Sequence, residues 1–221
     1  REVSDALGAT AREIEPGWTE HEIAGLLCHK LVALGIHTPV ILIAVDERIR
    51  RFRHPIPTGQ RLREYAMLVA SVKRGGLVNS STRLVHFGPL PADLRRRHDA
   101  CVQVDACFNL ETRPGVTAGA VFSKAVQTYA AQGFPEEWRL HHQGGATGYQ
   151  GRAYRANAAT PHKVRLNQAF AWNPSITGTK SEDTILVTEA GPEVLSPARD
   201  WPMVTVEYQG RQMARPDILV R

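Results

Sequence analysis

The chain has 221 residues, of which 43% are apolar, 22% charged and 7% aromatic. A chain of this length and composition can bury a substantial core without a disulfide or metal, and long disorder is excluded. The formal net charge of +5 permits a polyanionic partner. The basic residues are scattered and are not interleaved with aromatic residues, which argues against nucleic-acid binding. The longest apolar run, 39–45, is too short to cross a bilayer, so we expect no membrane association.

The three cysteines, Cys28, Cys101 and Cys107, are odd in number and show no CxxC spacing. This pattern favours three reduced, buried thiols over a disulfide framework or a zinc site. We therefore expect a cytoplasmic protein.

The periodicity of apolar residues predicts two helices and strands, followed by two more helices and more strands. Thr19 and Glu22 have the spacing of a capping box, which predicts that the second helix begins there. In chain order, the expected elements are a helix ending at Ile14, a helix from Thr19 to Gly35, a strand at 40–45, a loop at 46–60, a hairpin of strands 65–72 and 77–87, helices at 92–110 and 117–132, and strands at 139–142, 164–172, 184–188 and 203–208.

This order of elements predicts a single α+β domain, built from two similar halves with antiparallel strand pairs. The sequence contains no linker, no low-complexity tract and no glycine-rich phosphate-binding motif, so a nucleotide-binding fold is not expected.

Polar residues concentrate in four segments where strands are expected to end: 51–55, 79–83, 141–149 and 172–184. Polar side chains are costly to bury without partners, so their convergence would indicate a functional site. Each segment also has a plain structural interpretation. His54 could lie on a surface loop, and Glu182 could belong to a solvated turn. His141 and His142 are adjacent, so on a strand only one of them can enter a given pocket.

Five segments together resemble the pita-bread peptidases, which include methionine aminopeptidase, Xaa-Pro aminopeptidase, prolidase and creatinase. Residues 16–23 (PGWTEHEI) resemble the family's PG-x-T-E-x-E entry, and residues 76–88 (GLVNSSTRLVHFG) resemble its GYxxDxTRTFxxG hairpin. His142 with Gly144-Gly145 resembles GHGxG, 171–174 resemble xxEP, and 182–191 resemble EDTxxVTExG. The resemblance covers nearly the whole chain in the family's order. It implies a pita-bread fold: a curved antiparallel sheet with four main helices on its outer face.

The resemblance also identifies which metal ligands are missing. Active members of the family hold two divalent ions with Asp, Asp, His, Glu and Glu. The corresponding positions in this chain are Val69, Ser80, His142, Asn173 and Glu182. One imidazole and one carboxylate do not offset the charge of two divalent ions, so we expect no catalytic metal and no cofactor.

The resemblance implies that the remaining polar residues line one cavity. His54, His142 and Glu182 are the expected catalytic residues, since imidazole titrates near working pH and a carboxylate can orient it. The expected substrate-binding residues are Ser80, Arg83, His141, Tyr149, Asn173 and Lys180. We expect Glu182 to be buried against an imidazole or a cation, with His54 facing the same cavity. We also expect the strand from Arg139 to pair near Thr82.

Two functions follow from this interpretation. The first is a metal-independent hydrolase that acts on the C–N bond of a small amide, peptide or amidine. The alternative is a catalytically inactive homologue that binds a small ligand, a peptide or a protein. We expect residues 1–221 to form one catalytic-type domain. The family's larger members carry a further N-terminal domain and often pair subunits, which makes a homodimer one expected assembly.

Overall fold

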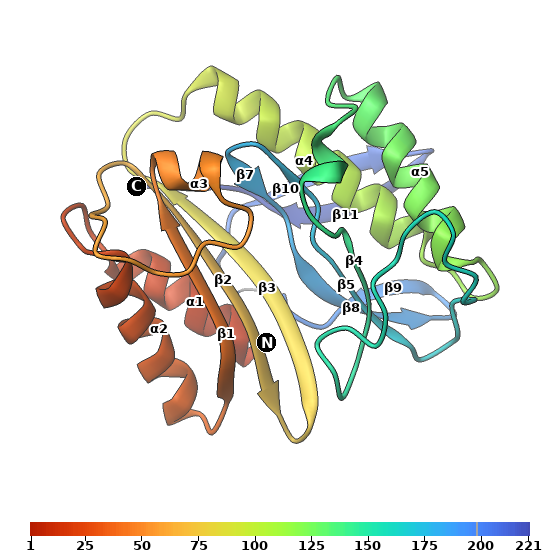
Figure 1. Cartoon of the computed structure of the whole chain (residues 1–221), viewed down its shortest axis with the longest axis horizontal. Helices are drawn as coiled ribbons and strands as arrows, with labels where there is room; N and C mark the ends of the chain where they lie inside the picture. Colours follow the sequence, from red (N-terminus) through yellow and green to blue (C-terminus); the bar gives the residue numbers. More distant parts are fainter. Residues whose placement is uncertain (198) are drawn as a thin grey trace.

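The computed structural model describes residues 1–197 and 199–221. Its two halves each place a pair of helices against a four-stranded sheet (Figure 1). The first half contains α1 (Glu2–Glu13), α2 (Glu20–Ala33), β1 (His37–Val45), α3 (Glu47–Arg51), β2 (Tyr65–Arg74) and β3 (Leu77–His86). The second contains α4 (Ala92–Glu111), α5 (Ala118–Ala131), a 3-10 turn (Glu137–Leu140), β4 (Gly144–Thr147), β5 (Ala169–Trp172), β8 (Asp183–Thr188) and β9 (Gly191–Val194).

The first sheet has the strand order β1-β2-β3-β12, with β12 at Leu219–Val220. The second has the order β4-β5-β8-β9. Two short hairpins complete the fold: β6 (Ser175–Ile176) with β7 (Thr179–Lys180), and β10 (Met203–Tyr208) with β11 (Arg211–Pro216). All pairings within these strands are antiparallel except that of β12 with β3.

The two sheets meet where β3 runs beside the start of β8. The Thr82 amide donates to the carbonyl of Glu182 at 3.0 Å, and the Ser80 amide donates to Thr184 Oγ1 at 2.8 Å. These bonds join the sheets into one curved surface. They also place two polar segments side by side that lie about a hundred residues apart in sequence.

The strand period of two separates a core face from a cavity face in the first sheet. On β2, Leu68, Ala70 and Val72 pack among the side chains of α1 and α2, whereas Val69 and Ser71 point to the opposite side and line a cavity. A second core lies between α4, α5 and the second sheet, with Phe108, Phe122, Phe170 and Trp172 among its members. The helices therefore cover the outer side, and the inner face remains available for a site.

Most expected elements are confirmed, including the capping box of Thr19 and Glu22, in which both hydrogen bonds are present. Three predictions about residues 46–60 and 139–142 were wrong. Residues 139–142 do not form a strand, because Glu137–Leu140 form a 3-10 turn in which the Arg139 amide donates to the carbonyl of Glu136 at 3.1 Å. The neighbour of Thr82 is therefore Glu182 and not a strand from Arg139. Within the loop predicted at 46–60, residues Glu47–Arg51 form α3.

Candidate active site

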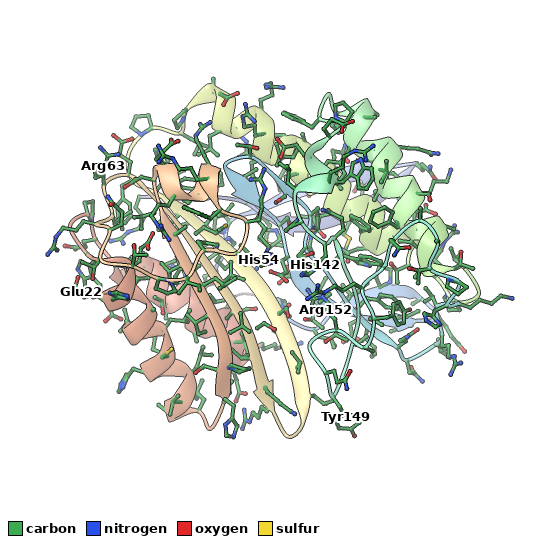
Figure 2. All side chains as sticks on the ribbon, in the orientation of Figure 1. Glu22, His54, Arg63, His142, Tyr149 and Arg152 are labelled. Carbon is green, nitrogen blue, oxygen red and sulfur yellow. The ribbon has the colours of Figure 1, made fainter. Side chains whose placement is uncertain are left out.

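A cavity of about 410 Å³ lies on the inner face between the two sheets. Its lining has an apolar part and a polar part. Val40, Leu42 and Val69 form an apolar wall on the first sheet, and the polar groups come mostly from the second half of the chain. The other lining residues are His54, Ser71, Ser80, His142, Gly151, Arg152, Arg155, Asn173, Lys180 and Glu182. Figure 2 shows His54, His142 and Arg152 close together between the two halves.

Glu182 is the only carboxylate among the residues that line this cavity. Its side chain is buried, with 3% of the residue exposed. Thr82 Oγ1 donates to Glu182 Oε2 at 2.8 Å. Lys180 Nζ lies 3.4 Å from the same oxygen, and Arg152 Nη2 lies 3.3 Å from Oε1. Burial alone raises the pKa of Glu182, but Lys180, Arg152 and Thr82 outweigh it, so the pKa is lowered and the carboxylate is ionised.

Lys180 and Arg152 are therefore held at the centre of the cavity by one shared carboxylate. Lys180 is also buried, with 3% exposed. Arg152 Nη1 lies 3.4 Å from Ser80 Oγ, which itself donates to Ser71 Oγ at 2.9 Å. With Arg155 at the rim, three cations and one carboxylate face the same space. The cavity has a net positive charge.

Three imidazoles cluster beside these cations. The ring of His54 lies 5.2 Å from that of His142 and 5.4 Å from that of His141, centroid to centroid. Burial and the nearby Lys180 lower the pKa of His54 to about 4, and burial and Arg152 lower the pKa of His142 to about 4. Burial, followed by Lys180, lowers the pKa of His141 to about 2. All three rings are therefore neutral near pH 7.

A backbone hydrogen bond fixes the tautomer of His142. The Gly144 amide donates to Nδ1 of His142 at 3.2 Å. A neutral imidazole that accepts at Nδ1 carries its proton on Nε2, so His142 presents an N–H donor. Position 144 requires glycine, because its φ is +101° and because a Cβ there would meet the carbonyl oxygen of Ala171 at 2.2 Å.

Six of the nine predicted site residues line the cavity: His54, Ser80, His142, Asn173, Lys180 and Glu182. The expectation that Arg83 lines it was wrong. Arg83 Nη2 donates to Asp183 Oδ1 at 3.0 Å on the other face of the sheet. Tyr149 was also misplaced, since it is 76% exposed in the loop after β4 and lies apart from the cluster (Figure 2). His141 belongs to the imidazole cluster but does not line the cavity. Its Nε2 donates to the carbonyl of Asn173 at 3.0 Å.

Arg152 and Arg155 were missed by the sequence analysis. They lie in the irregular segment between β4 and β5, where neither a periodic pattern nor a quoted motif marks them. The one available signal was the pair of arginines itself, three residues apart and shortly after the His142 segment.

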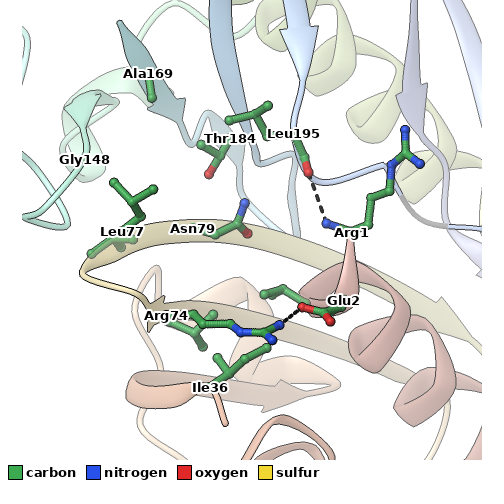
Figure 3. A pocket seen from close by; sticks show the side chains of 13 residues that line it. Arg1, Glu2, Ile36, Arg74, Leu77, Asn79, Gly148, Ala169, Thr184 and Leu195 are labelled. Carbon is green, nitrogen blue, oxygen red and sulfur yellow. Dashed lines mark hydrogen bonds and ion pairs between the residues drawn. The ribbon is translucent and has the colours of Figure 1, made fainter. Parts of the chain in front are cut away.

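A smaller cavity of about 240 Å³ lies between the start of α1, the β2–β3 turn and the segment at Leu195 (Figure 3). Much of its lining is aliphatic. Glu2 and Arg74, two of its charged side chains, pair with each other, and the backbone nitrogen of Arg1 lies 3.2 Å from the carbonyl oxygen of Leu195. No histidine or cysteine is among its lining residues, so it offers no comparable chemistry.

The comparisons with known proteins agree with the fold. Residues 1–189 match the model of metallopeptidase family M24. The chain belongs to this family. An Xaa-Pro dipeptidase from Bacillus anthracis superposes with a TM-score of 0.82 and 17% identity, over 99% of this chain and 60% of that one. A prolidase from Pyrococcus horikoshii OT3 superposes with a TM-score of 0.80 and 20% identity, over 90% of this chain and 60% of that one.

A curated relative is more similar in sequence over a shorter stretch. The agropine synthesis cyclase of Rhizobium rhizogenes is 33% identical in an alignment of 117 residues, which covers 49% of this chain and 29% of that protein. This chain thus spans under a third of the curated relative and about three fifths of the structural neighbours. No helix in the described part of the chain is long and apolar enough to cross a membrane.

The metal ions that the family name implies do not fit this site. Within residues 1–197 and 199–221, no group of three or more His, Cys, Asp or Glu side chains converges as metal ligands. Val69 offers no donor atom, and the only lining carboxylate already contacts two cationic side chains. A third cation on Glu182 would be repelled by both.

Proposed function

We propose that this chain acts without a metal on the amide C–N bond of a small, anionic substrate. The observation that carries the proposal is the pair of cations, Lys180 and Arg152, held on Glu182 inside the cavity. In a pocket shielded from water, fixed positive groups stabilise the negative charge that develops on a carbonyl oxygen during attack. The two side chains could thus supply the polarisation that metal ions supply in active peptidases.

The charge of the cavity supports an anionic substrate. Lys180, Arg152 and Arg155 outnumber the single carboxylate of Glu182, so a ligand carboxylate would be attracted. An amidine or guanidinium substrate is cationic and would be repelled. Among the substrate classes expected from the sequence, the amide and peptide bonds therefore fit best.

The two imidazoles that line the cavity have different roles. The Gly144 amide donates to Nδ1 of His142, so the ring carries its proton on Nε2. From there it can donate a hydrogen bond to the developing oxyanion. His54 makes no hydrogen bond within the described chain and is exposed at the cavity, so its ring can accept a proton. A bound anion beside His54 would raise its pKa, since an opposite charge favours the imidazolium form.

A hydrolytic cycle follows from these roles. The oxygen of a water molecule attacks the carbonyl carbon while His54 accepts the water proton. Lys180 and His142 hold the oxyanion of the tetrahedral intermediate. The C–N bond then breaks, and the imidazolium of His54 returns its proton to the leaving amine. The products are a carboxylic acid and an amine.

The test is an assay of the purified protein on dipeptides and N-acyl amino acids, read by product mass. We expect hydrolysis with the gain of one water, and a loss of about 100-fold or more in kcat/KM for His54→Gln, the range for a general base. Because the pKa of free His54 is about 4, kcat/KM should fall only below about pH 5 and stay level towards neutral pH. A half-maximum near 6.5 would contradict His54 as the base.

Ring closure is a second candidate, favoured by the 33% identity to a protein named agropine synthesis cyclase. The same carbonyl activation would serve if a nucleophile within the substrate attacked in place of water, gave its proton to His54, and displaced the amine, which leaves with that proton. The mass assay separates the candidates, since ring closure gives a cyclic product without uptake of water. Binding of the substrates without any product would instead favour the inactive, ligand-binding homologue.

A further inference from the structure

Asn173, which stands where the resemblance places a metal-binding Glu, is rigidly held at the end of β5. The preceding Trp172 is buried and stacks on Phe108 with centroids 4.5 Å apart. The Asn173 amide donates to the carbonyl of Gln143 at 3.1 Å, and its own carbonyl accepts from His141 Nε2 at 3.0 Å. Its backbone is therefore fixed on both sides.

A chain of buried hydrogen bonds sets the direction of the contact from His141. Tyr129 donates its hydroxyl to Gln143 Oε1 at 2.8 Å. The Gln143 amide nitrogen lies 3.0 Å from the carbonyl oxygens of Trp138 and His141, which makes it a donor, and it lies 3.0 Å from Nδ1 of His141. A neutral His141 that accepts at Nδ1 must donate from Nε2, which is the nitrogen facing the carbonyl of Asn173. His141 thus positions Asn173 rather than contacting the ligand.

The side-chain oxygen of Asn173, by contrast, has no hydrogen-bond partner in the described part of the chain. The residue is 2% exposed and lines the cavity. Its Oδ1 is buried without a hydrogen bond to any group in residues 1–197 and 199–221. A buried acceptor without a donor costs free energy, and a ligand N–H that reaches it would remove this cost. A side-chain amide offers both an acceptor and a donor, whichever way it is oriented.

We infer that Asn173 selects amides that carry an N–H, so that the substrates are primary or secondary amides and not N-alkylated amides. The inference rests on the proposed function and deepens it. A secondary amide supplies an N–H to the Asn173 oxygen and a carbonyl to its NH₂. The amide nitrogen of an Xaa-Pro bond has no hydrogen, so the acceptor would stay buried and unpaired. This chain would therefore disfavour the Xaa-Pro bond after which the dipeptidase from Bacillus anthracis is named.

The test compares matched dipeptides of the Xaa-Gly and Xaa-sarcosine series, which differ by one methyl group on the amide nitrogen. An unpaired buried acceptor corresponds to a preference of about 5- to 150-fold in kcat/KM for Xaa-Gly. In Asn173→Ala the preference should shrink to within about threefold, because no acceptor remains to be left unpaired. Asn173→Ser, which keeps an acceptor, should retain part of it. As a matched control, Asn79→Ala on β3, which lines the smaller cavity, should keep the full preference.

Each outcome decides between the two claims. Equal turnover of both series by the unchanged protein would overturn the role of Asn173 and leave the proposed function standing. A preference that persists in Asn173→Ala would reflect the bulk of the methyl group and would also overturn it. If neither series is turned over, calorimetric binding decides: tighter binding of Xaa-Gly supports the inference while the proposed hydrolysis fails. Equal binding, or none, overturns it.

Discussion

Replacing Arg215 with Met should lower the free energy of unfolding by about 3–5 kcal/mol. Arg215 lies on β11 and is fully buried. Its Nε donates to Asp105 Oδ2 at 2.7 Å, and its Nη2 donates to Asp183 Oδ2 at 3.0 Å. Without Arg215, Asp105 would lose its cation, and burial already raises the pKa of this carboxyl even with Arg215 beside it. Urea denaturation curves measure the change.

Arg63→Met is the matched control, because Arg63 is exposed and lies 3.6 Å from Asp46. Its effect should stay within about 0.5 kcal/mol. Arg215→Lys keeps one positive charge, so its loss of unfolding free energy should lie between the losses of Arg215→Met and Arg63→Met. Equal stability of the Arg215→Met and Arg63→Met variants would contradict the structural role of the buried network.

The second large effect is expected at Lys180. Lys180→Met should reduce kcat/KM about 10²- to 10³-fold, the range for the loss of one group that stabilises an oxyanion. The melting temperature should change far less than in Arg215→Met, because Arg152 still pairs with Glu182. Lys124→Met, an exposed position on α5, is the control. Turnover of Lys180→Met within threefold of the unchanged protein would rule out this role for Lys180.

The position of the cavity could be predicted from the sequence because the motif segments occur in the family's order. His54, His142 and Glu182 come from three different parts of the chain, and their convergence follows from that order and not from local spacing. The long amphipathic helices and the hairpin of β2 and β3 could also be predicted from the sequence, since periodicity and caps mark them directly.

The error at Arg83 has a simple physical cause. Neighbouring residues on a strand point to opposite faces, and Thr82 faces Glu182 at the cavity. Arg83 must then point away, where it meets Asp183. The same alternation places the side chains of Glu182 and Asp183 on opposite faces of the sheet. Resemblance identified the motif correctly, and the strand period decides which of its residues reach the site.

Other features depend on tertiary contacts that no local pattern reports. The strand expected at 164–172 is shorter, at Ala169–Trp172, because Val164 instead exchanges backbone hydrogen bonds with the segment at Val116. Arg152 enters the cavity from a segment without regular structure, so its pairing with Glu182 could be found only from coordinates.

The central claim is that cationic side chains replace metal ions at this site. The most direct test is elemental analysis and turnover measured on one purified sample, before and after chelation. We predict well below one equivalent of Mn, Co, Fe or Zn per chain and the same turnover after chelation. Stoichiometric metal bound through His142 and Glu182, with turnover lost on its removal and restored on its return, would contradict the account.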